Sequence, residues 1–210
     1  VTGYTLTVDI MEDAPASENE EVVVAAIEKG GIIYRYTTLE KALAAADENA
    51  TITLVDDVTL TATLNVNKNV TLDLGDYTIY GANVKFGALQ VAENKKLIIN
   101  AKDGGVKGGS GADCIAISVL GSLDINGGNY SVGPDKNGLG NSCIEVRKNA
   151  AEVNIYGGTF SSEAAYMGFY YVLNIQQTAG VLTPIVKVYG GTFIKYRSEE
   201  RRVGEECRSR

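Results

Sequence analysis

Glu152-Val-Asn-Ile-Tyr-Gly-Gly-Thr-Phe160 recurs one period later as Val186-Lys-Val-Tyr-Gly-Gly-Thr-Phe193. More divergent versions of this segment precede it: Asn69-Val-Thr-Leu-Asp-Leu-Gly75, Lys96-Leu-Ile-Ile-Asn100 and Ser122-Leu-Asp-Ile-Asn-Gly-Gly-Asn-Tyr130. The pattern returns about every 25 to 33 residues, and a repeat of this size is typical of a solenoid made of stacked turns. Because a solenoid is a scaffold, its function has to be argued from the side chains on its faces.

Each turn contains two strands in which apolar and polar residues alternate, and a period of two places the apolar residues on one face. In the first strand, the expected inward pairs are Leu64/Val66, Leu89/Val91, Ile115/Ile117, Ile144/Val146 and Leu173/Ile175. In the second strand, they are Leu72/Leu74, Leu97/Ile99, Leu123/Ile125, Val153/Ile155 and Val186/Val188. A third apolar point follows at Ile79, Val106, Tyr130, Phe160 and Phe193. Three inward points per turn predict an all-β fold, a right-handed parallel β-helix of about five turns.

Stacked turns would also align the residues that follow each second strand, which are Gly75, Asn100, Asn126, Tyr156 and Tyr189. This alignment predicts an amide ladder between Asn100 and Asn126, and an aromatic stack between Tyr156 and Tyr189. The Gly-Gly pairs at 127–128, 157–158 and 190–191 are expected at corners, where glycine adopts a positive φ at little cost. They do not fit a phosphate-binding loop, because no Lys-Ser/Thr follows them.

Composition excludes several classes of function for this chain of 210 residues. The formal net charge of −7 argues against sequence-independent nucleic-acid binding, which needs Lys and Arg to displace counterions. Because there is no His, Ser-His-Asp and Cys-His catalysis are excluded and the commonest metal ligand is missing. No apolar run approaches the roughly 18 residues that a membrane-spanning helix needs. We therefore expect no nucleic-acid partner, no membrane insertion, no cofactor, and no catalytic or metal-binding residues in these turns.

The N-terminal region divides into two parts. Residues 1–21 hold an alternating stretch, Tyr4–Ile10, and then an acidic run, which we interpret as the end of a preceding domain or an acidic linker. An unstructured N-terminus is the alternative. Residues 22–50 are predicted to form a β-hairpin with its turn at Glu28-Lys-Gly-Gly31, and then a helix from Thr38 to about Glu48.

Thr37 with Glu40 fits a capping box at the start of this helix. The helix has one apolar face, formed by Leu39, Ala42, Leu43 and Ala46. Such a helix would cover the open end of the solenoid, where unpaired strand edges would otherwise face other chains.

The last 14 residues, 197–210, do not follow the repeat, and nine of them are charged. They resemble the translation of a common DNA sequencing adapter, from which they differ at Glu205, where Lys would be expected. A genuine charged C-terminal helix is the alternative. We expect an artefactual tail and therefore a truncated β-helix at 51–196 that continues in the natural protein. The first residue is Val, which indicates a processed protein or a fragment.

Three segments carry a resemblance to a known family: Tyr36-Thr-Thr-Leu-Glu-Lys-Ala-Leu, Ala50-Thr-Ile-Thr-Leu-Val-Asp-Asp-Val-Thr-Leu60 and Asn69-Val-Thr-Leu-Asp-Leu-Gly-Asp-Tyr-Thr-Ile79. They resemble pectin-lyase-like β-helix domains in large secreted or surface proteins of gut bacteria. The Tyr-Gly-Gly-Thr-Phe repeats are similar to those proteins and to some phage fibre and spike proteins. The resemblance covers about residues 22–196 and implies an extracellular or cell-surface location. Members include polysaccharide lyases and hydrolases, adhesins, and modules with no known activity.

The resemblance implies that an enzyme of this family would use clustered carboxylates, so acidic residues on the outer face are candidates. Asp73 and Asp124 are expected at outward positions of the second strand, separated by the turn that carries Ile98. Two turns correspond to roughly 9–10 Å, which is at the edge of the carboxylate separation in inverting glycosidases. We interpret both as solvated residues of the outer face.

Two loops, 131–142 and 161–171, are expected to flank a shallow groove. Aromatic side chains that would stack on sugar rings are Tyr166, Phe169 and Tyr170, and polar side chains that would bind hydroxyls are Asp135, Asn137 and Glu163. The alternative is that the aromatic side chains pack the loop against the solenoid. A calcium site at Asp113 and Asp135 would need further oxygen ligands.

Cys114 and Cys143 are expected in the same slot of successive turns, each just before an inward Ile. Their Cα atoms would then lie about 4.8 Å apart, which is within the disulfide range. The slot also holds Ala88 and Val172, so plain packing of small apolar residues is the favoured interpretation and a disulfide is the alternative.

A regular repeat without a catalytic cluster predicts a non-enzymatic cell-surface or fibre module for presentation, adhesion or carbohydrate binding. By the resemblance, its partner would be a polysaccharide or a host surface glycan. One alternative is a polysaccharide lyase or glycoside hydrolase whose active site lies in further turns or in the two loops. Another is a phage spike or fibre segment, which predicts a trimer.

Overall fold

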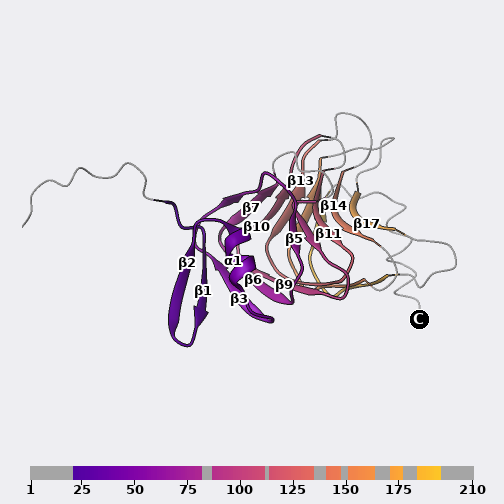
Figure 1. Cartoon of the computed structure of the whole chain (residues 1–210). Coiled ribbons are helices and arrows are strands. Elements are labelled where there is room, and N and C mark those ends of the chain that lie inside the picture. Colours follow the sequence, from indigo (N-terminus) through magenta and orange to yellow (C-terminus); the bar gives the residue numbers. More distant parts are fainter. Residues whose placement is uncertain are drawn as a thin grey trace, which may run out of the picture.

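The computed structural model describes residues 21–81, 87–111, 114–134, 141–147, 151–163, 171–176 and 184–194 (Figure 1). Over these ranges the chain winds repeatedly through three β-sheets, and a short helix lies near the N-terminal strands. Outside an antiparallel hairpin at the N-terminal end, strands pair in parallel with strands of neighbouring turns. The predicted parallel β-helix with an N-terminal hairpin and a short helix is therefore confirmed.

We name the sheets A, B and C in the order in which each turn passes through them. Sheet A has eight strands, in the spatial order β18 (Ile185–Val188), β15 (Glu152–Ile155), β12 (Ser122–Asn126), β9 (Lys96–Ala101), β6 (Val70–Gly75), β3 (Ala50–Leu54), β1 (Ala25–Lys29) and β2 (Ile32–Tyr36). Sheet B has six strands, β19 (Thr192–Ile194), β16 (Thr159–Ser162), β13 (Asn129–Val132), β10 (Gly105–Gly108), β7 (Thr78–Gly81) and β4 (Val58–Thr59). Sheet C has five strands, β17 (Tyr171–Ile175), β14 (Ser142–Val146), β11 (Ile115–Val119), β8 (Leu89–Val91) and β5 (Leu64–Val66).

The inward side chains of the three sheets form one hydrophobic core along the axis. The sheet B column was predicted correctly, and it consists of Ile79, Val106, Tyr130, Phe160 and Phe193. Tyr130 and Phe160 are buried and stack with ring centroids 5.0 Å apart. Phe160 also stacks on Phe193 at 4.9 Å. Removal of this apolar surface from water provides the main favourable free energy of the fold.

The register in the second turn of sheet A differs from the prediction by two residues. Val70 and Leu72, not Leu72 and Leu74, lie beside Leu97 and Ile99. The register shifts again between Asp73 and Gly75, so Leu74 is also buried, at an irregular position of the strand. A β-bulge of this kind lets the chain present an additional residue to the core.

A similar two-residue error affects sheet C in the third turn. Ile117 and Val119, not Ile115 and Ile117, lie beside Leu89 and Val91 of the turn before. Ile115 is instead opposite Ser142, at the start of the strand, and is buried there.

The predicted hairpin and the predicted capping helix both lie at the N-terminal end of the solenoid (Figure 1). The hairpin turns at Gly30 and Gly31, which both have positive φ and so match the twist of the strands. Strand β1 then pairs antiparallel with β3 and extends sheet A beyond the first turn. The expected apolar face of the helix is buried, and its members are Leu39, Ala42, Leu43 and Ala46.

Helix α1 spans Leu39–Ala45 and is shorter than predicted. Its N-cap is Thr38, whose side chain accepts a hydrogen bond from the Lys41 N–H at 3.2 Å, so the predicted capping box of Thr37 and Glu40 is wrong. Two lysines stabilise the C-terminal end by donating to carbonyl oxygens of the last turn. Lys29 Nζ donates to Ala45 O at 2.8 Å, and Lys68 Nζ donates to Ala44 O at 2.8 Å and Ala46 O at 2.6 Å.

Candidate functional site

The outer face of sheet A presents two straight columns of side chains, one residue per turn in each. The first, which we call the tyrosine column, consists of Thr53, Asp73, Asn100, Asn126, Tyr156 and Tyr189. The second, which we call the ionic column, consists of Thr51, Thr71, Ile98, Asp124, Asn154 and Lys187. Asp73 and Asp124 therefore lie in different columns, and the predicted common column of these two carboxylates is wrong because of the register shift in β6.

Both ladders predicted for the tyrosine column are confirmed. Asn126 Nδ2 donates to Asn100 Oδ1 at 2.9 Å. The rings of Tyr156 and Tyr189 stack with centroids 5.0 Å apart and planes within 5° of parallel. Tyr156 is 50% exposed and Tyr189 is 63% exposed, so the rings form a ridge at the surface. The stack covers one face of each ring, and the exposed remainder offers hydroxyls and ring surface to a ligand.

The charged groups of the ionic column are occupied by contacts within the column and with the flanking residues Lys96 and Glu152. The side chain of Asp124 is only 13% exposed, and its carboxylate is held by Lys96 Nζ at 2.6 Å and Asn154 Nδ2 at 2.8 Å. Lys187 Nζ donates to Glu152 Oε1 at 3.0 Å on the same face. The hydrogen bond from Lys187 lowers the pKa of Glu152, and the same contact raises the pKa of Lys187. These contacts join successive turns, so the column holds the stack together.

A second polar cluster lies on the outer face of sheet C, and sequence reasoning missed it. Glu145 is buried and accepts hydrogen bonds from Arg147 Nε at 2.9 Å and Nη2 at 2.7 Å on one oxygen. Its other oxygen accepts from Gln176 Nε2 in the next turn. Ser118 lies beside Glu145 in the preceding turn, and its buried hydroxyl has no hydrogen-bond partner among the described residues. The outward position of Glu145 was visible in the alternation, but its burial was not.

A shallow depression of about 320 Å³ lies at the corner between sheets B and C. Glycines line most of it, together with Tyr80, Lys107 and Ser110. Lys107 Nζ lies 5.4 Å from the centre of the Tyr80 ring, which is within the range of a cation–π contact. The Lys107 ammonium group gives this depression a local positive charge, but one ammonium group does not identify a ligand.

Most of the predicted loop site lies outside the described residues, namely Asp135, Asn137, Tyr166, Phe169 and Tyr170. Glu163 is described, follows β16 directly and is exposed. Its N–H donates to Val132 O at 3.0 Å, so the backbone there still follows the stack. A groove between the two loops remains a prediction.

The two cysteines in the solenoid are buried thiols and no disulfide joins them. The predicted shared slot is wrong, because the register places Ala116 rather than Cys114 beside Cys143. The slot holds Ala88, Ala116, Cys143 and Val172, which are all buried, so the favoured interpretation of plain packing is confirmed for Cys143. Burial raises the pKa of the Cys143 thiol, which keeps it protonated.

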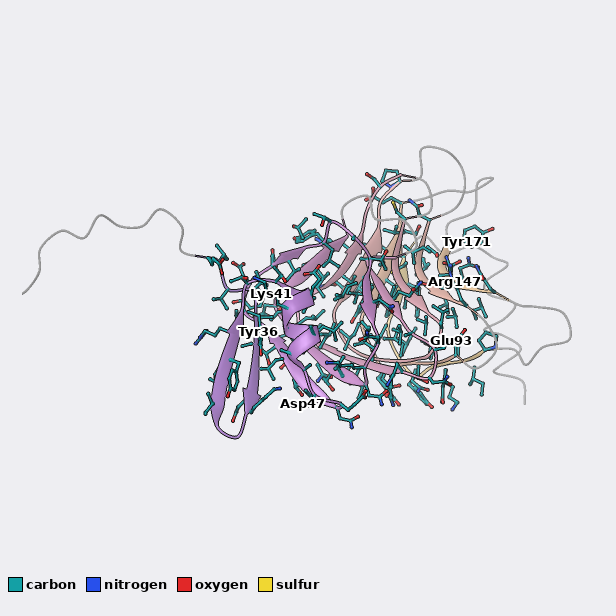
Figure 2. All side chains as sticks on the ribbon, viewed as in Figure 1. Tyr36, Lys41, Asp47, Glu93, Arg147 and Tyr171 are labelled. Carbon is teal, nitrogen blue, oxygen red and sulfur yellow. The ribbon has the colours of Figure 1, made fainter. Side chains whose placement is uncertain are left out.

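Within the described ranges, no three His, Cys, Asp or Glu side chains come together in a way that would hold a metal ion. Figure 2 places Tyr36, Lys41 and Asp47 at the hairpin end of the molecule, and Arg147 and Tyr171 toward the opposite end.

No helix in the described part of the chain has the length and apolar character needed to cross a membrane. Calcium at Asp113 and Asp135 falls outside the described residues.

No protein-family model, curated protein or solved structure matches this chain. The fold is therefore established by the pairing of its strands, and function has to be argued from its surface.

Proposed function

We propose that this chain is a non-enzymatic module of a cell-surface or fibre protein, related to pectin-lyase-like β-helix domains, that binds a carbohydrate or protein ligand along the outer face of sheet A. The observation that carries the proposal is the exposed ridge of Tyr156 and Tyr189, which continues the ladder of Asn100 and Asn126. Exposed tyrosines and amides combine contact area with hydrogen-bonding groups, a pairing that recurs in binding surfaces.

The neighbouring contacts support binding along the axis of the solenoid. Side chains in one column repeat at the spacing of adjacent strands, about 4.8 Å, so the column offers evenly spaced hydrogen-bonding groups to an extended ligand. The ionic column lies beside it and fixes adjacent turns to one another through Asp124 and Lys187. A binding surface on a rigid sheet loses little conformational entropy when the ligand binds.

Binding is tested with the full 210-residue chain on arrays of immobilised polysaccharides and host-type glycans. We expect retention on at least one ligand, and we expect the double variant Tyr156→Ala/Tyr189→Ala to bind at least about ten-fold more weakly. The matched control is Tyr77→Ala, because Tyr77 is also exposed, at 37%, and lies outside the column.

Two outcomes would overturn the proposal. Equal weakening by the Tyr77 variant would show that the tyrosine column is not the binding surface. Release of soluble oligosaccharides from the polysaccharide panel would identify an enzyme. A stable trimer in light scattering would favour a fibre segment over a cell-surface module.

A further inference from the structure

The two ends of the solenoid differ in how they are closed. At the N-terminal end, sheet A continues into the antiparallel strands β1 and β2, and α1 covers the core. At the other end, β18, β19 and β17 are the last described strands of sheets A, B and C. Their outer edges therefore lack a neighbouring strand within the described part of the chain.

Side chains that point inward become exposed at this last turn. Val188 is 50% exposed, whereas Ile155, its partner one turn earlier, is fully buried. Phe193 is partly exposed, whereas Phe160, on which it stacks, is fully buried. Among the described residues, this end is thus a partly exposed cross-section of the core, bordered by strand edges.

We propose that this end, formed by β18 and β19, docks one further turn of parallel β-helix. The docked turn is expected to make the same contacts that already join neighbouring turns of the solenoid. It carries two alternating apolar residues over Val186 and Val188, and an aromatic residue over Phe193 that extends the ring stack at 4.9–5.0 Å.

The corner of the docked turn must also carry glycine. Gly128, Gly158 and Gly191 lie in one column and have φ values of 91°, 114° and 121°. A Cβ on Gly158 would lie 2.9 Å from Gly128 O, and one on Gly191 would lie 3.1 Å from Gly158 O. Turns can stack this closely only through glycine, so the docking segment has the form Val-x-Val-x-Gly-Gly-x-Phe.

A second copy of this chain does not fit the same surface. Its N-terminal end is closed by the hairpin and helix. Its C-terminal end could only approach with two-fold symmetry, which makes the strands antiparallel. Antiparallel pairing would not continue the parallel register that stacks Phe193 on Phe160.

The test replaces residues 195–210 with a copy of residues 162–194, whose 33 residues reproduce the spacing from Phe160 to Phe193. We expect hydrogen exchange of the amides in β18 and β19 to slow by about ten-fold or more, because their edges become paired. The matched control carries the same added segment with the copies of Val186 and Val188 changed to Asp and the copy of Phe193 changed to Ser.

A second measurement does not depend on the folding of the fused chain. A synthetic peptide with the sequence of residues 162–194 is added to the unaltered 210-residue chain, and the control peptide carries the same three changes. Selective slowing of exchange in β18 and β19 by the first peptide supports the proposal. Exchange that is unchanged, or changed equally by both peptides and both fusions, overturns it. Dimerisation of the unaltered chain that is abolished by Val188→Asp would also overturn it, by identifying a second copy as the occupant.

Discussion

Phe160 is the best place to test whether the ring column of sheet B stabilises the fold. Its side chain is fully buried and stacks on Tyr130 at 5.0 Å and on Phe193 at 4.9 Å. Phe160→Ala removes one buried ring and leaves a cavity between two others. Replacing a buried Phe by Ala typically lowers the free energy of unfolding by about 3–5 kcal/mol. Because two ring stacks are lost as well, we expect a value in the upper half of this range, about 4–5 kcal/mol.

The assay is urea denaturation followed by far-ultraviolet circular dichroism, with the slope compared between variants to confirm that the transition is comparable. Phe193→Ala is the matched control, because Phe193 is partly exposed and stacks on one ring among the described residues, so we expect a loss of only about 1–2 kcal/mol. Phe160→Leu, which retains most of the volume, should fall between the two. A loss below about 1.5 kcal/mol for Phe160→Ala, or equal losses for Phe160→Ala and Phe193→Ala, would refute the idea that the ring column of sheet B stabilises the fold.

Three further perturbations test other parts of the stack. Thr38→Ala should lower the free energy of unfolding by about 1 kcal/mol in the same assay, more than Thr37→Ala; the reverse order would restore the capping box to Thr37. Gly105→Ala would place a Cβ 1.8 Å from a backbone oxygen and should cost about 3 kcal/mol, whereas Gly157→Ala, with nothing closer than 3.8 Å, should stay within about 0.5 kcal/mol. Glu48 has a pKa lowered by hydrogen bonds from a backbone N–H and a lysine ammonium, so its stabilisation is present above its ordinary pKa and is lost as pH falls through the lowered value. The melting temperatures of the wild type and Glu48→Gln should therefore differ at neutral pH and converge in acid; a difference that persists in acid would contradict this.

The repeat predicted the fold because each inward position is set by local alternation and then reinforced by every neighbouring turn. Sheet B shows this best, since the predicted apolar residue of each turn lies directly beside that of the next turn. The Asn100–Asn126 and Tyr156–Tyr189 ladders were predictable for the same reason. Their strands align without a bulge, so residues equivalent in sequence are neighbours in space.

Register was predicted less well where a strand contains more apolar residues than the core needs. Strand β6 offers Val70, Leu72 and Leu74 on one face, and any adjacent two of them fit the pattern. A slip of two residues keeps every side chain on the same face, so alternation cannot detect it. The same ambiguity explains sheet C, where Ile115, Ile117 and Val119 all point inward, and it caused the wrong slot for Cys114.

The cluster at Glu145 shows a different limit of sequence reasoning. Its partner Gln176 is 31 residues away and belongs to the next turn, so their contact depends on the three-dimensional register. The alternation marks Glu145 as outward but does not reveal that its carboxylate is buried. A carboxylate can be buried only if its hydrogen bonds are supplied, and here Arg147 and Gln176 supply them. Without the neighbouring turns in place, Glu145 resembles an ordinary surface residue.

On the outer face of sheet A, one column of side chains mainly joins the turns, and the other is available to bind a ligand. A parallel stack makes each outward residue the neighbour of its equivalent in the next turn. The side chains of a column can therefore either contact one another or contact a ligand. The ionic column makes its contacts within the protein, because Asp124 is held by Asn154 of the same column and by the flanking Lys96. The tyrosine column also joins turns, but Tyr156 and Tyr189 leave half or more of their surface exposed. Substitutions in the ionic column should therefore weaken the stack, whereas substitutions of these tyrosines should alter binding at a smaller cost in stability. This difference makes the tyrosine column the part of the surface where ligand specificity can change while the fold is retained.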